Sequence, residues 1–392
     1  MHKKEKVIIA GGGFGGIKAA LELANKPEFD VTLISDQPNF RYYPTLYHAA
    51  TGGKVAASSI PLDEIFRDKG VQVVTDSIKH INRDKKTVIG KKSYEYDTLI
   101  LALGVVTNFF GIKGLSEYAY GIKTIEEAQR LRDHIHKHLV DERKPDLNYV
   151  VIGGGPTGVE LAGALPSYIR HIMARHGLKD TRVHVDLVEA APRLMPRMPR
   201  AYSKALARQL KKMGVKLYLG ETVEAETADF LNFSEHTLES HTVIWTAGVT
   251  NHPFFKDNNF TLTPRGKVLV NEYLETERHI YVVGDNADTT YSGMAQTALH
   301  DGKTVAHNLI RQFNDKPRLA YEAVKPAYAT PAGPRWAALL WGPFHTYGWL
   351  GWVLRSAADW IAYHDLEPVW QATKHLMAEI GEEETCPVCK SD

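Results

Sequence analysis

Two glycine-rich segments have the residue types and the spacing that hold the pyrophosphate of a dinucleotide. The pattern G-x-G-x-x-G falls on Gly11, Gly13 and Gly16, and again on Gly153, Gly155 and Gly158. Its first glycine allows a tight turn, its second lets the backbone approach the pyrophosphate, and its third lets a helix pack on a strand. The helix N-terminus then offers free N–H groups to the phosphates. The chain is therefore predicted to bind two dinucleotides, at turns that also contain Phe14, Gly15 and Thr157.

A strand must precede each of these turns and a helix must follow it, because the pattern is informative only in that context. Apolar, β-branched runs precede the turns at residues 7–10 and 150–152, and helix-like segments follow at 17–24 and 159–165. This context predicts an α/β fold with two Rossmann-like units.

The two fingerprints also open the same series of elements. A second strand ends in polar or acidic residues in each copy, at 31–36 and 183–189, and each copy closes with an apolar strand that runs into Gly104 or Gly248. The closing glycine follows the first fingerprint glycine by 93 residues in one copy (11 to 104) and by 95 in the other (153 to 248). A repeat of this kind indicates two copies of one structural unit.

An acidic residue at the end of the second strand is the usual ligand of an adenosine ribose. In the second copy this residue is Glu189, which would repel a 2′-phosphate and so favours NADH over NADPH. Arg193 lies close in sequence and could weaken this preference. The alternative is that Glu189 is only a solvated carboxylate at the end of a strand. In the first copy Ser35 and Asp36 both fall near this position, and we take Asp36 as the ribose ligand.

Composition limits the possible functions. The chain has 392 residues and a formal net charge of +1, which gives no sign of a nucleic-acid surface. It begins without an apolar segment and cleavage site, so we expect no secretory signal. Cys386 and Cys389 are its two cysteines, which points to a reducing compartment. Their C-x-x-C spacing suits a zinc site shared by two chains, a redox-active tail, or neither.

A third apolar strand, at residues 280–283, ends in Gly284 and Asp285. With the two fingerprints it resembles the two-dinucleotide flavoprotein reductases, in which such an aspartate binds the ribityl chain of the flavin. The resemblance implies that the first unit holds FAD and the second holds a nicotinamide nucleotide. It also implies that Ile78, Gly104 and Ala295 belong to the FAD site and Gly248 to a nucleotide site.

Several segments are similar, in order, to the type II NADH:quinone oxidoreductases, the single-chain NADH dehydrogenases that pump no protons. They are residues 40–52, 108–111, 122–128, 153–163, 188–194 and 245–249. The similarity spans about residues 5–313 and implies a division of the chain into domains. An FAD domain would comprise 1–108 and 255–313, an NADH domain 109–254, and a C-terminal segment 314–392.

The same resemblance implies catalytic residues. Glu160 would lie near the nicotinamide and the flavin, with a structural role on its helix as the alternative. The family's quinone signature is Ala-Gln-x-Ala-x-Gln, and here residues 295–300 keep Gln296 but place His300 at the second glutamine. An imidazole can donate a hydrogen bond to a quinone carbonyl and deliver a proton near neutral pH. A helix-start histidine satisfied by the backbone is the alternative for His300.

The C-terminal segment is unusually rich in tryptophan, since six of the seven lie between residues 336 and 370. Residues 349–361 and 369–380 have the spacing of amphipathic helices, and neither approaches the roughly 20 apolar residues of a spanning helix. The resemblance implies peripheral docking on the cytoplasmic face of the cell membrane. A homodimer interface or a flap over the core is the alternative, and the excess of acid over base in 335–392 does not favour anionic lipid.

The resemblance thus predicts an enzyme that passes a hydride from NADH to FAD and two electrons on to a membrane quinone, with no metal. Sulfide:quinone oxidoreductases are an alternative, but they need cysteines beside the flavin, and residues 1–385 contain none. A soluble NADH-dependent flavoprotein reductase or oxidase remains the other alternative.

Overall fold

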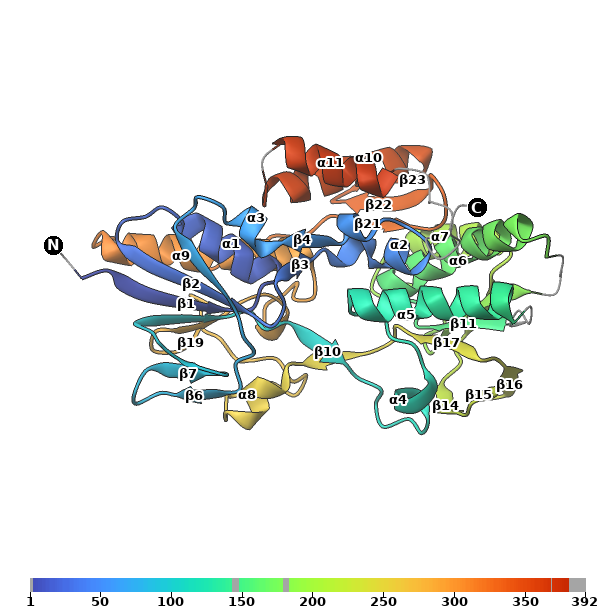
Figure 1. Ribbon diagram of the computed structural model, residues 1–392, viewed down its shortest axis with the longest axis horizontal. Coiled ribbons are helices and arrows are strands. Elements are labelled where there is room, and N and C mark those ends of the chain that lie inside the picture. Colours follow the sequence, from blue (N-terminus) through green and yellow to red (C-terminus); the bar gives the residue numbers. More distant parts are fainter. Residues whose placement is uncertain (1–2, 143–147, 179–182, 368, 381–392) are drawn as a thin grey trace. The chain divides into compact units, whose positions relative to one another are not determined.

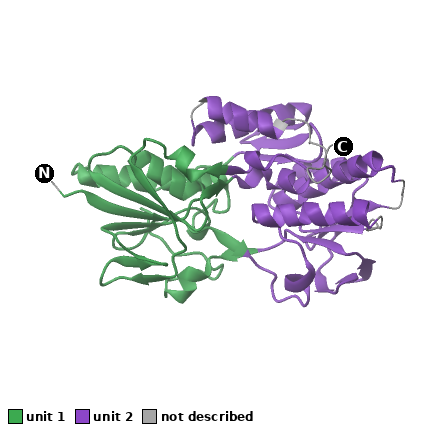
Figure 2. Cartoon of the chain, viewed as in Figure 1, with its two compact units in different colours: residues 1–41, 60–106, 249–326 green, residues 42–59, 107–248, 327–392 purple. Residues whose placement is uncertain are grey.

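The computed structural model describes residues 3–142, 148–178, 183–367 and 369–380. The chain forms two compact units (Figure 2). Unit 1 comprises Met1–Arg41, Ile60–Val106 and Val249–Pro326, and unit 2 comprises Tyr42–Ser59, Thr107–Gly248 and Ala327–Asp392. Each unit contains a parallel sheet covered by helices, so the predicted α/β fold with two Rossmann-like units is confirmed.

Unit 1 is built on a six-stranded sheet in the order β19-β20-β9-β1-β2-β5. Its strands are β1 (Glu5–Ala10), β2 (Phe29–Ser35), β5 (Val71–Thr75), β9 (Thr98–Leu101), β19 (Glu275–Glu277) and β20 (Ile280–Val282). All neighbours pair in parallel except β19 with β20. Residues 7–10 of β1 and all four residues of β9 are buried, as expected of strands covered on both faces.

One long-range helix pair and a three-stranded antiparallel sheet, β6-β7-β8, complete unit 1. Helices α1 (Phe14–Leu23) and α9 (Ala295–Phe313) pack against each other beside the sheet (Figure 1). A Cβ at Gly302 would lie 2.2 Å from Gly15 O, so the two helices approach closely because both positions are glycine. The remaining elements are α3 (Leu62–Ile65), β6 (His80–Asn82), β7 (Thr87–Ile89), β8 (Ser93–Glu95), α8 (Pro253–Asp257) and η4 (Gly284–Asn286).

Unit 2 repeats the plan with a four-stranded parallel sheet in the order β13-β12-β11-β17. Its strands are β11 (Asn148–Ile152), β12 (His184–Glu189), β13 (Lys216–Leu219) and β17 (Thr242–Trp245), and its helices are α5 (Ile125–His136), α6 (Pro156–Arg175) and α7 (Arg200–Lys212). Helix α5 starts at a capping box in which Thr124 Oγ1 accepts from Glu127 N and the Glu127 carboxylate accepts from Thr124 N. The other elements are α4 (Leu115–Tyr118), η3 (Lys137–Asp141), β14 (Val223–Glu226), β15 (Phe230–Phe233) and β16 (His236–Glu239).

The short segment 42–59 belongs to unit 2, although unit 1 precedes and follows it in sequence. It contains η1 (Tyr43–Thr45), α2 (Leu46–Ala50) and η2 (Val55–Ala57), and α2 packs on α5 and α6. The strand pairs β3 (Asn39–Arg41) with β4 (Ser59–Pro61) and β10 (Val105–Thr107) with β18 (Val249–Asn251) lie at the points where the chain leaves and re-enters unit 1. The sequence had assigned residues 42–59 to the FAD domain.

The C-terminal segment is part of unit 2 from residue 327 onward, whereas the sequence had suggested a separate segment from 314. It forms an antiparallel sheet of β21 (Tyr328–Pro331), β22 (Ala337–Trp341) and β23 (Phe344–Gly348), followed by α10 (Trp349–His364) and α11 (Val369–Ile380). The sheet packs on α6 and α7, and α10 packs on the sheet and on α11 (Figure 1).

Helix α10 is amphipathic, but its apolar side faces outward. Trp349, Leu350 and Ile361 are exposed, while Arg355 and Asp359 are buried. None of the helices in the described part of the chain has the length and apolar character needed to cross a membrane.

Candidate dinucleotide sites

The first fingerprint turns the chain from β1 into α1 with a left-handed residue, Gly11, at φ +118°. A Cβ at Gly11 would lie 2.0 Å from Ala102 O, and one at Gly16 would lie 2.0 Å from Gly11 O, so neither position tolerates a side chain. A Cβ at Gly13, by contrast, meets nothing within 4 Å. Gly13 is also the N-cap of α1, and no side chain caps that helix. The turn leaves open the space and the N–H groups that a pyrophosphate needs.

The second fingerprint has the same geometry between β11 and α6. Gly153 has φ +112°, and a Cβ at Gly158 would lie 1.9 Å from Gly153 O. Gly155 is the uncapped N-cap of α6 with nothing within 4 Å of a Cβ, and Thr157 beside it is exposed. Both turns therefore fit a dinucleotide pyrophosphate by the same test.

Glu189 stands where the sequence placed it, at the end of β12 and beside the second fingerprint. Its two carboxylate oxygens accept from Gly154 N at 2.5 Å and from Ala191 N at 2.7 Å, which fixes the carboxylate next to the turn. Arg193 is held elsewhere, because its guanidinium donates to Met198 O at 2.6 Å and to Ser203 Oγ at 2.8 Å. A carboxylate without a competing cation is the arrangement that suits two ribose hydroxyls.

In unit 1, two residues lie near the place that corresponds to Glu189, Ser35 and Asp36. Ser35 is buried at the end of β2, and a Cβ at Gly12 would lie 2.5 Å from Ser35 Oγ, so the hydroxyl is next to the fingerprint. Asp36 is mostly exposed and pairs with Arg41 at 3.1 Å. Ser35 therefore contacts the turn itself, while Asp36 is positioned farther out by an arginine.

Asp285 lies in η4, at the carboxyl end of β20, and its carboxylate has no hydrogen-bond partner among the described residues. The turn that carries it is held firmly. Asn286 exchanges two hydrogen bonds with Gly104, donating to its O at 2.6 Å and accepting from its N at 2.9 Å. Gly284 N donates to Asp301 Oδ2 at 2.9 Å. Ligands bind at the carboxyl ends of parallel strands, and Asp285 is available there.

Asn286 and Asp301 are two further candidate site residues, which the sequence analysis did not single out. Asp301 is fully buried on α9, directly after His300, and burial raises the pKa of its carboxyl to about 7. An acidic residue directly after the quinone-like signature was the signal available in the sequence. Asn286 directly follows Gly284 and Asp285, and a polar residue at the end of a strand was the signal for it in the sequence.

The two remaining FAD-site residues differ in position. Ala295 is half-buried as the first residue of α9. Ile78 is buried in an apolar cluster with Ala10 and Ile34, at the carboxyl ends of β1 and β2. In unit 2, Gly248 is packed against Phe110, because a Cβ at Gly248 would lie 2.4 Å from that ring.

The candidate quinone residues lie on the first two turns of α9. Gln296 is exposed and His300 is half-buried. His300 Nε2 lies 2.9 Å from Glu322 O, and its ring centroid is 5.3 Å from that of Tyr321. The carbonyl can only accept, so Nε2 carries a proton and Nδ1 is the nitrogen left for chemistry.

Glu160 lies on α6, two residues after the last glycine of the second fingerprint, and is partly exposed. Burial raises the pKa of its carboxyl to about 8, opposed by Arg355 and aided by Glu379. The group therefore carries a proton at neutral pH, as a general acid must.

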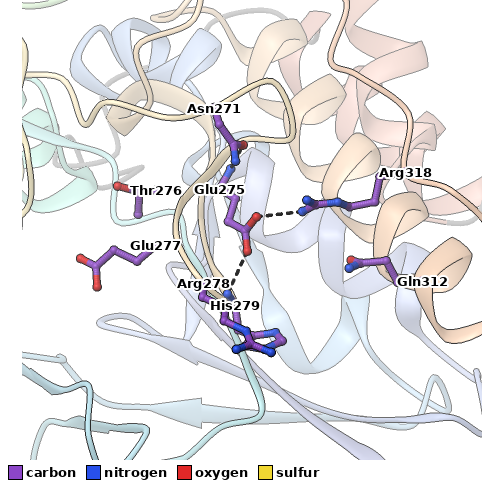
Figure 3. A pocket seen from close by; sticks show the side chains of 8 residues that line it. All are labelled: Asn271, Glu275, Thr276, Glu277, Arg278, His279, Gln312 and Arg318. Atoms are coloured by element: carbon purple, nitrogen blue, oxygen red, sulfur yellow. Dashed lines mark hydrogen bonds and ion pairs between the residues drawn. The ribbon is translucent and has the colours of Figure 1, made fainter.

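A separate cavity of about 460 Å³ lies in unit 1 (Figure 3). It is lined by the β19–β20 hairpin together with Gln312 and Arg318, and Arg318 pairs with Glu275 at 2.8 Å. The hairpin is at the amino end of β20, opposite the end that carries Asp285.

Among the described residues no cluster of histidine, cysteine and acidic side chains could hold a metal ion. Cys386 and Cys389 lie outside the described residues.

A family model, described as pyridine nucleotide-disulphide oxidoreductase, matches residues 5–325. The chain belongs to this family. Within it, the resemblance to type II NADH:quinone oxidoreductases is confirmed by curated relatives of that name. The protein of Staphylococcus haemolyticus is 28% identical over 346 residues, covering 82% of this chain and 86% of the relative. That of Mycobacterium tuberculosis is 28% identical over 398 residues, covering 92% and 84%.

Solved structures agree on the fold. NDH2 from Plasmodium falciparum, solved in complex with NADH, has a TM-score of 0.87 at 17% identity and covers 96% of this chain and 98% of its own. The sulfide:quinone oxidoreductase of Aquifex aeolicus has a TM-score of 0.78 at 20% identity, covering 97% and 96%. Both matches extend through the C-terminal segment that the family model leaves out. They show the fold alone, and the choice between the two activities depends on side chains.

Proposed function

We propose that the chain is a flavin-dependent NADH:quinone oxidoreductase. The observation that carries the proposal is the pair of open, uncapped glycine turns, one in the same sheet as the strand that leads to Gly284 and Asp285 and the other hydrogen-bonded to Glu189. The curated relatives of that name support the same function. Sulfide oxidation is disfavoured because residues 1–385 contain no cysteine to attack sulfide.

FAD would be held in unit 1 and NADH in unit 2. The N–H groups at the start of α1 would bind the FAD pyrophosphate, Ser35 and Asp36 the adenosine ribose, and Asp285 the ribityl chain. Asn286 and Asp301 keep the Asp285 turn in place through their bonds to Gly104 and Gly284. A bound flavin would supply the hydride acceptor and the two-electron donor that no side chain provides.

The nicotinamide nucleotide would bind through the start of α6 and through Glu189. The fixed Glu189 carboxylate can accept from both ribose hydroxyls but would repel a 2′-phosphate, so NADH is the preferred substrate. Glu160 follows on the same helix and holds a proton near neutral pH.

Gln296 and His300 would hold the quinone. A neutral imidazole bound to Glu322 O through Nε2–H presents Nδ1 as an acceptor. Protonation keeps that bond and adds a donor at Nδ1. His300 can therefore hydrogen-bond a quinone carbonyl and pass it a proton from Nδ1 without turning its ring.

The quinone is expected in a membrane, and we propose that the exposed apolar side of the C-terminal segment docks there. Large apolar side chains are exposed on β22, β23, α10 and α11: Trp341, Phe344, Trp349, Leu350, Ile361, Trp370 and Met377. Amphipathic helices with exposed tryptophan suit the interface of a bilayer. The acid excess of the segment favours a zwitterionic surface over an anionic one. The proposed location is the cytoplasmic face of the cell membrane.

Anaerobic half-reactions test the function. The purified protein with FAD is mixed with NADH, and then with a water-soluble quinone analogue, while the flavin absorbance is followed. Bleaching by NADH and rapid recovery with quinone are expected. Bleaching by sulfide instead would favour the sulfide:quinone reaction, and recovery with oxygen but not with quinone would favour a soluble oxidase.

A further inference from the structure

Met195 has a backbone conformation that residues other than glycine rarely adopt. It lies in the loop between β12 and α7, and its φ of +46° is in the left-handed region. The next residue is Pro196, which favours extended conformations in the residue before it. Strained residues of this kind persist only where their surroundings hold them in place, and they occur most often at functional sites. The contacts of Met195 must therefore compensate for this strain.

The side chain of Arg193 holds the loop at residues 194–199. Its guanidinium donates to Pro196 O, to Met198 O at 2.6 Å and to Ser203 Oγ at 2.8 Å. Ser203 is buried on the first turn of α7, so the guanidinium joins the loop to that helix. A guanidinium suits this task because its N–H donors have a fixed, planar arrangement. The N–H groups used in this way are not available to a nucleotide phosphate.

The loop that Arg193 holds is bonded to the second fingerprint. Met195 N donates to Gly154 O at 2.8 Å, and Gly154 N donates to the Glu189 carboxylate at 2.5 Å. The middle glycine of the turn is therefore fixed at both its amide nitrogen and its carbonyl oxygen. In unit 1 the equivalent carbonyl, Gly12 O, accepts no hydrogen bond from the described residues. A glycine-rich turn of this kind thus does not itself require the bond that Met195 makes.

A fixed Gly154 carbonyl also fixes the next amide group, the N–H of Gly155. The described chain contains no cis peptide bond, and in a planar trans peptide the C=O and the following N–H point in opposite directions. The bond from Met195 to Gly154 O therefore directs the Gly155 N–H away from the loop. This N–H donates to none of the described residues, and the Cβ position of Gly155 meets nothing within 4 Å. A donor that is oriented before the pyrophosphate arrives loses less conformational freedom on binding.

We infer that Arg193 is a positioning residue of the nicotinamide nucleotide site. It holds the loop so that Met195 N–H bonds Gly154 O, and this bond orients the Gly155 N–H for the pyrophosphate. The inference rests on the proposed function, which places NADH at the second fingerprint. Arg193 acts through the loop and contributes no charge to the nucleotide, because its guanidinium is occupied by Met198 O, Ser203 Oγ and a second carbonyl of the loop.

Amide hydrogen exchange in the FAD-loaded protein, without NADH, tests whether Arg193 holds the loop. In Arg193→Gln the amide of Met195 should exchange about tenfold faster, because the loop opens more readily when its side-chain bonds are lost. The two prolines of the loop carry no amide hydrogen, so a peptide over residues 194–199 reports few amides. Arg197→Gln is the matched control, because Arg197 is an exposed arginine of the same loop. Its exchange should equal that of the unchanged protein.

Stopped-flow reduction of the flavin at increasing NADH concentration tests the consequence for binding. In Arg193→Gln the Kd for NADH should rise about fivefold or more, because the Gly155 N–H is no longer oriented toward a charged oxygen. The reduction rate at saturating NADH should stay within about twofold, since the change acts on binding and not on hydride transfer. Arg193→Lys should behave like Arg193→Gln, because an ammonium group lacks the planar fork that reaches three acceptors. Ser203→Ala removes one acceptor and should give a smaller rise in Kd.

Three results would overturn the inference. The first is an unchanged exchange rate of Met195 in Arg193→Gln, and the second is faster exchange with an unchanged Kd for NADH. The third is an Arg193→Lys variant that binds NADH as tightly as the unchanged protein, because the charge and not the loop would then matter. If Arg193→Gln does not fold, the comparison of Ser203→Ala with Arg197→Gln decides, and equal Kd values in these two variants overturn the inference. Neither measurement needs quinone, so failure of the enzyme to reduce quinone counts against the proposed function alone.

Discussion

Alanine substitutions at two glycines of the second fingerprint should have different effects: Gly158→Ala should lower the stability of unit 2, and Gly155→Ala should weaken the binding of NADH. A Cβ at Gly158 would lie 1.9 Å from Gly153 O, so Gly158→Ala must push α6 away from the turn. Overpacking of this kind costs about 1–3 kcal/mol, which lowers the Tm of a unit of this size by about 2–12 °C. Gly155 has open space around its Cβ position and an ordinary φ of −77°. Gly155→Ala should therefore lose no more than about 1 kcal/mol, which reflects the N-cap preference for glycine over alanine.

The two variants should behave differently toward NADH. The methyl group of Gly155→Ala would occupy the approach of the pyrophosphate and remove at least one N–H bond to a charged oxygen, worth about 1.5–3 kcal/mol. The Kd for NADH should thus rise about 10- to 150-fold, while FAD stays bound. Gly13→Ala is the matched variant in unit 1 and should weaken FAD instead. Calorimetry for Tm and stopped-flow flavin reduction for NADH measure both effects. Unchanged NADH affinity in Gly155→Ala would refute the assignment of this turn to the nucleotide.

Three further changes have defined outcomes. Glu189→Ala should reduce the preference for NADH over NADPH about tenfold, measured as the ratio of the kcat/KM values for the two nucleotides. Equal use of both nucleotides by the unchanged enzyme would contradict the role of Glu189. His300→Ala should slow reoxidation of the flavin by quinone about a hundredfold or more while reduction by NADH stays the same, and His300→Gln should restore quinone binding. An unaltered reoxidation rate in His300→Ala would make the residue structural. Trp349→Ser combined with Trp370→Ser should weaken flotation with zwitterionic liposomes about a hundredfold or more, since both rings are about two-thirds exposed, whereas Leu319→Ser combined with Val324→Ser should not. A protein that never floats, but whose dimer dissociates in the tryptophan variant, would identify the surface as a dimer interface.

The two Rossmann-like units were predictable because their signals are local and repeated. Each fingerprint needs only the strand before it and the helix after it, and Glu189 needs only the next strand. The position of Glu189 at Gly154 follows from that order of elements. Asp36 shows the limit of the method, because the sequence does not reveal that Arg41 holds it at the surface while Ser35 lies at the turn.

The polar side of α10 could not be assigned from the sequence. The sequence predicts that the apolar side of this helix docks on a membrane, on a second copy or over the core, and it leaves the surroundings of Arg355 and Asp359 open. The structure buries both residues, and the partner of Asp359 comes from a remote part of the chain, since Tyr42 is 317 residues away. Long-range pairing leaves no periodic signal near either residue. The same holds for segment 42–59, whose place in unit 2 depends on helices that follow it by many residues.

The path of the chain through its units has a consequence for synthesis on the ribosome. Strand β20, which pairs with β9 inside the sheet of unit 1, is made only at residues 280–282. Until then one edge of β9 has no partner, and α9 cannot cover α1. The parallel sheet of unit 2 is complete once residue 245 has been made. The sheet of unit 1 should therefore be completed after the parallel sheet of unit 2, although the last elements of unit 2 are made later still. A nascent chain released before residue 280 would expose an open strand edge, a form prone to aggregation and to capture by chaperones.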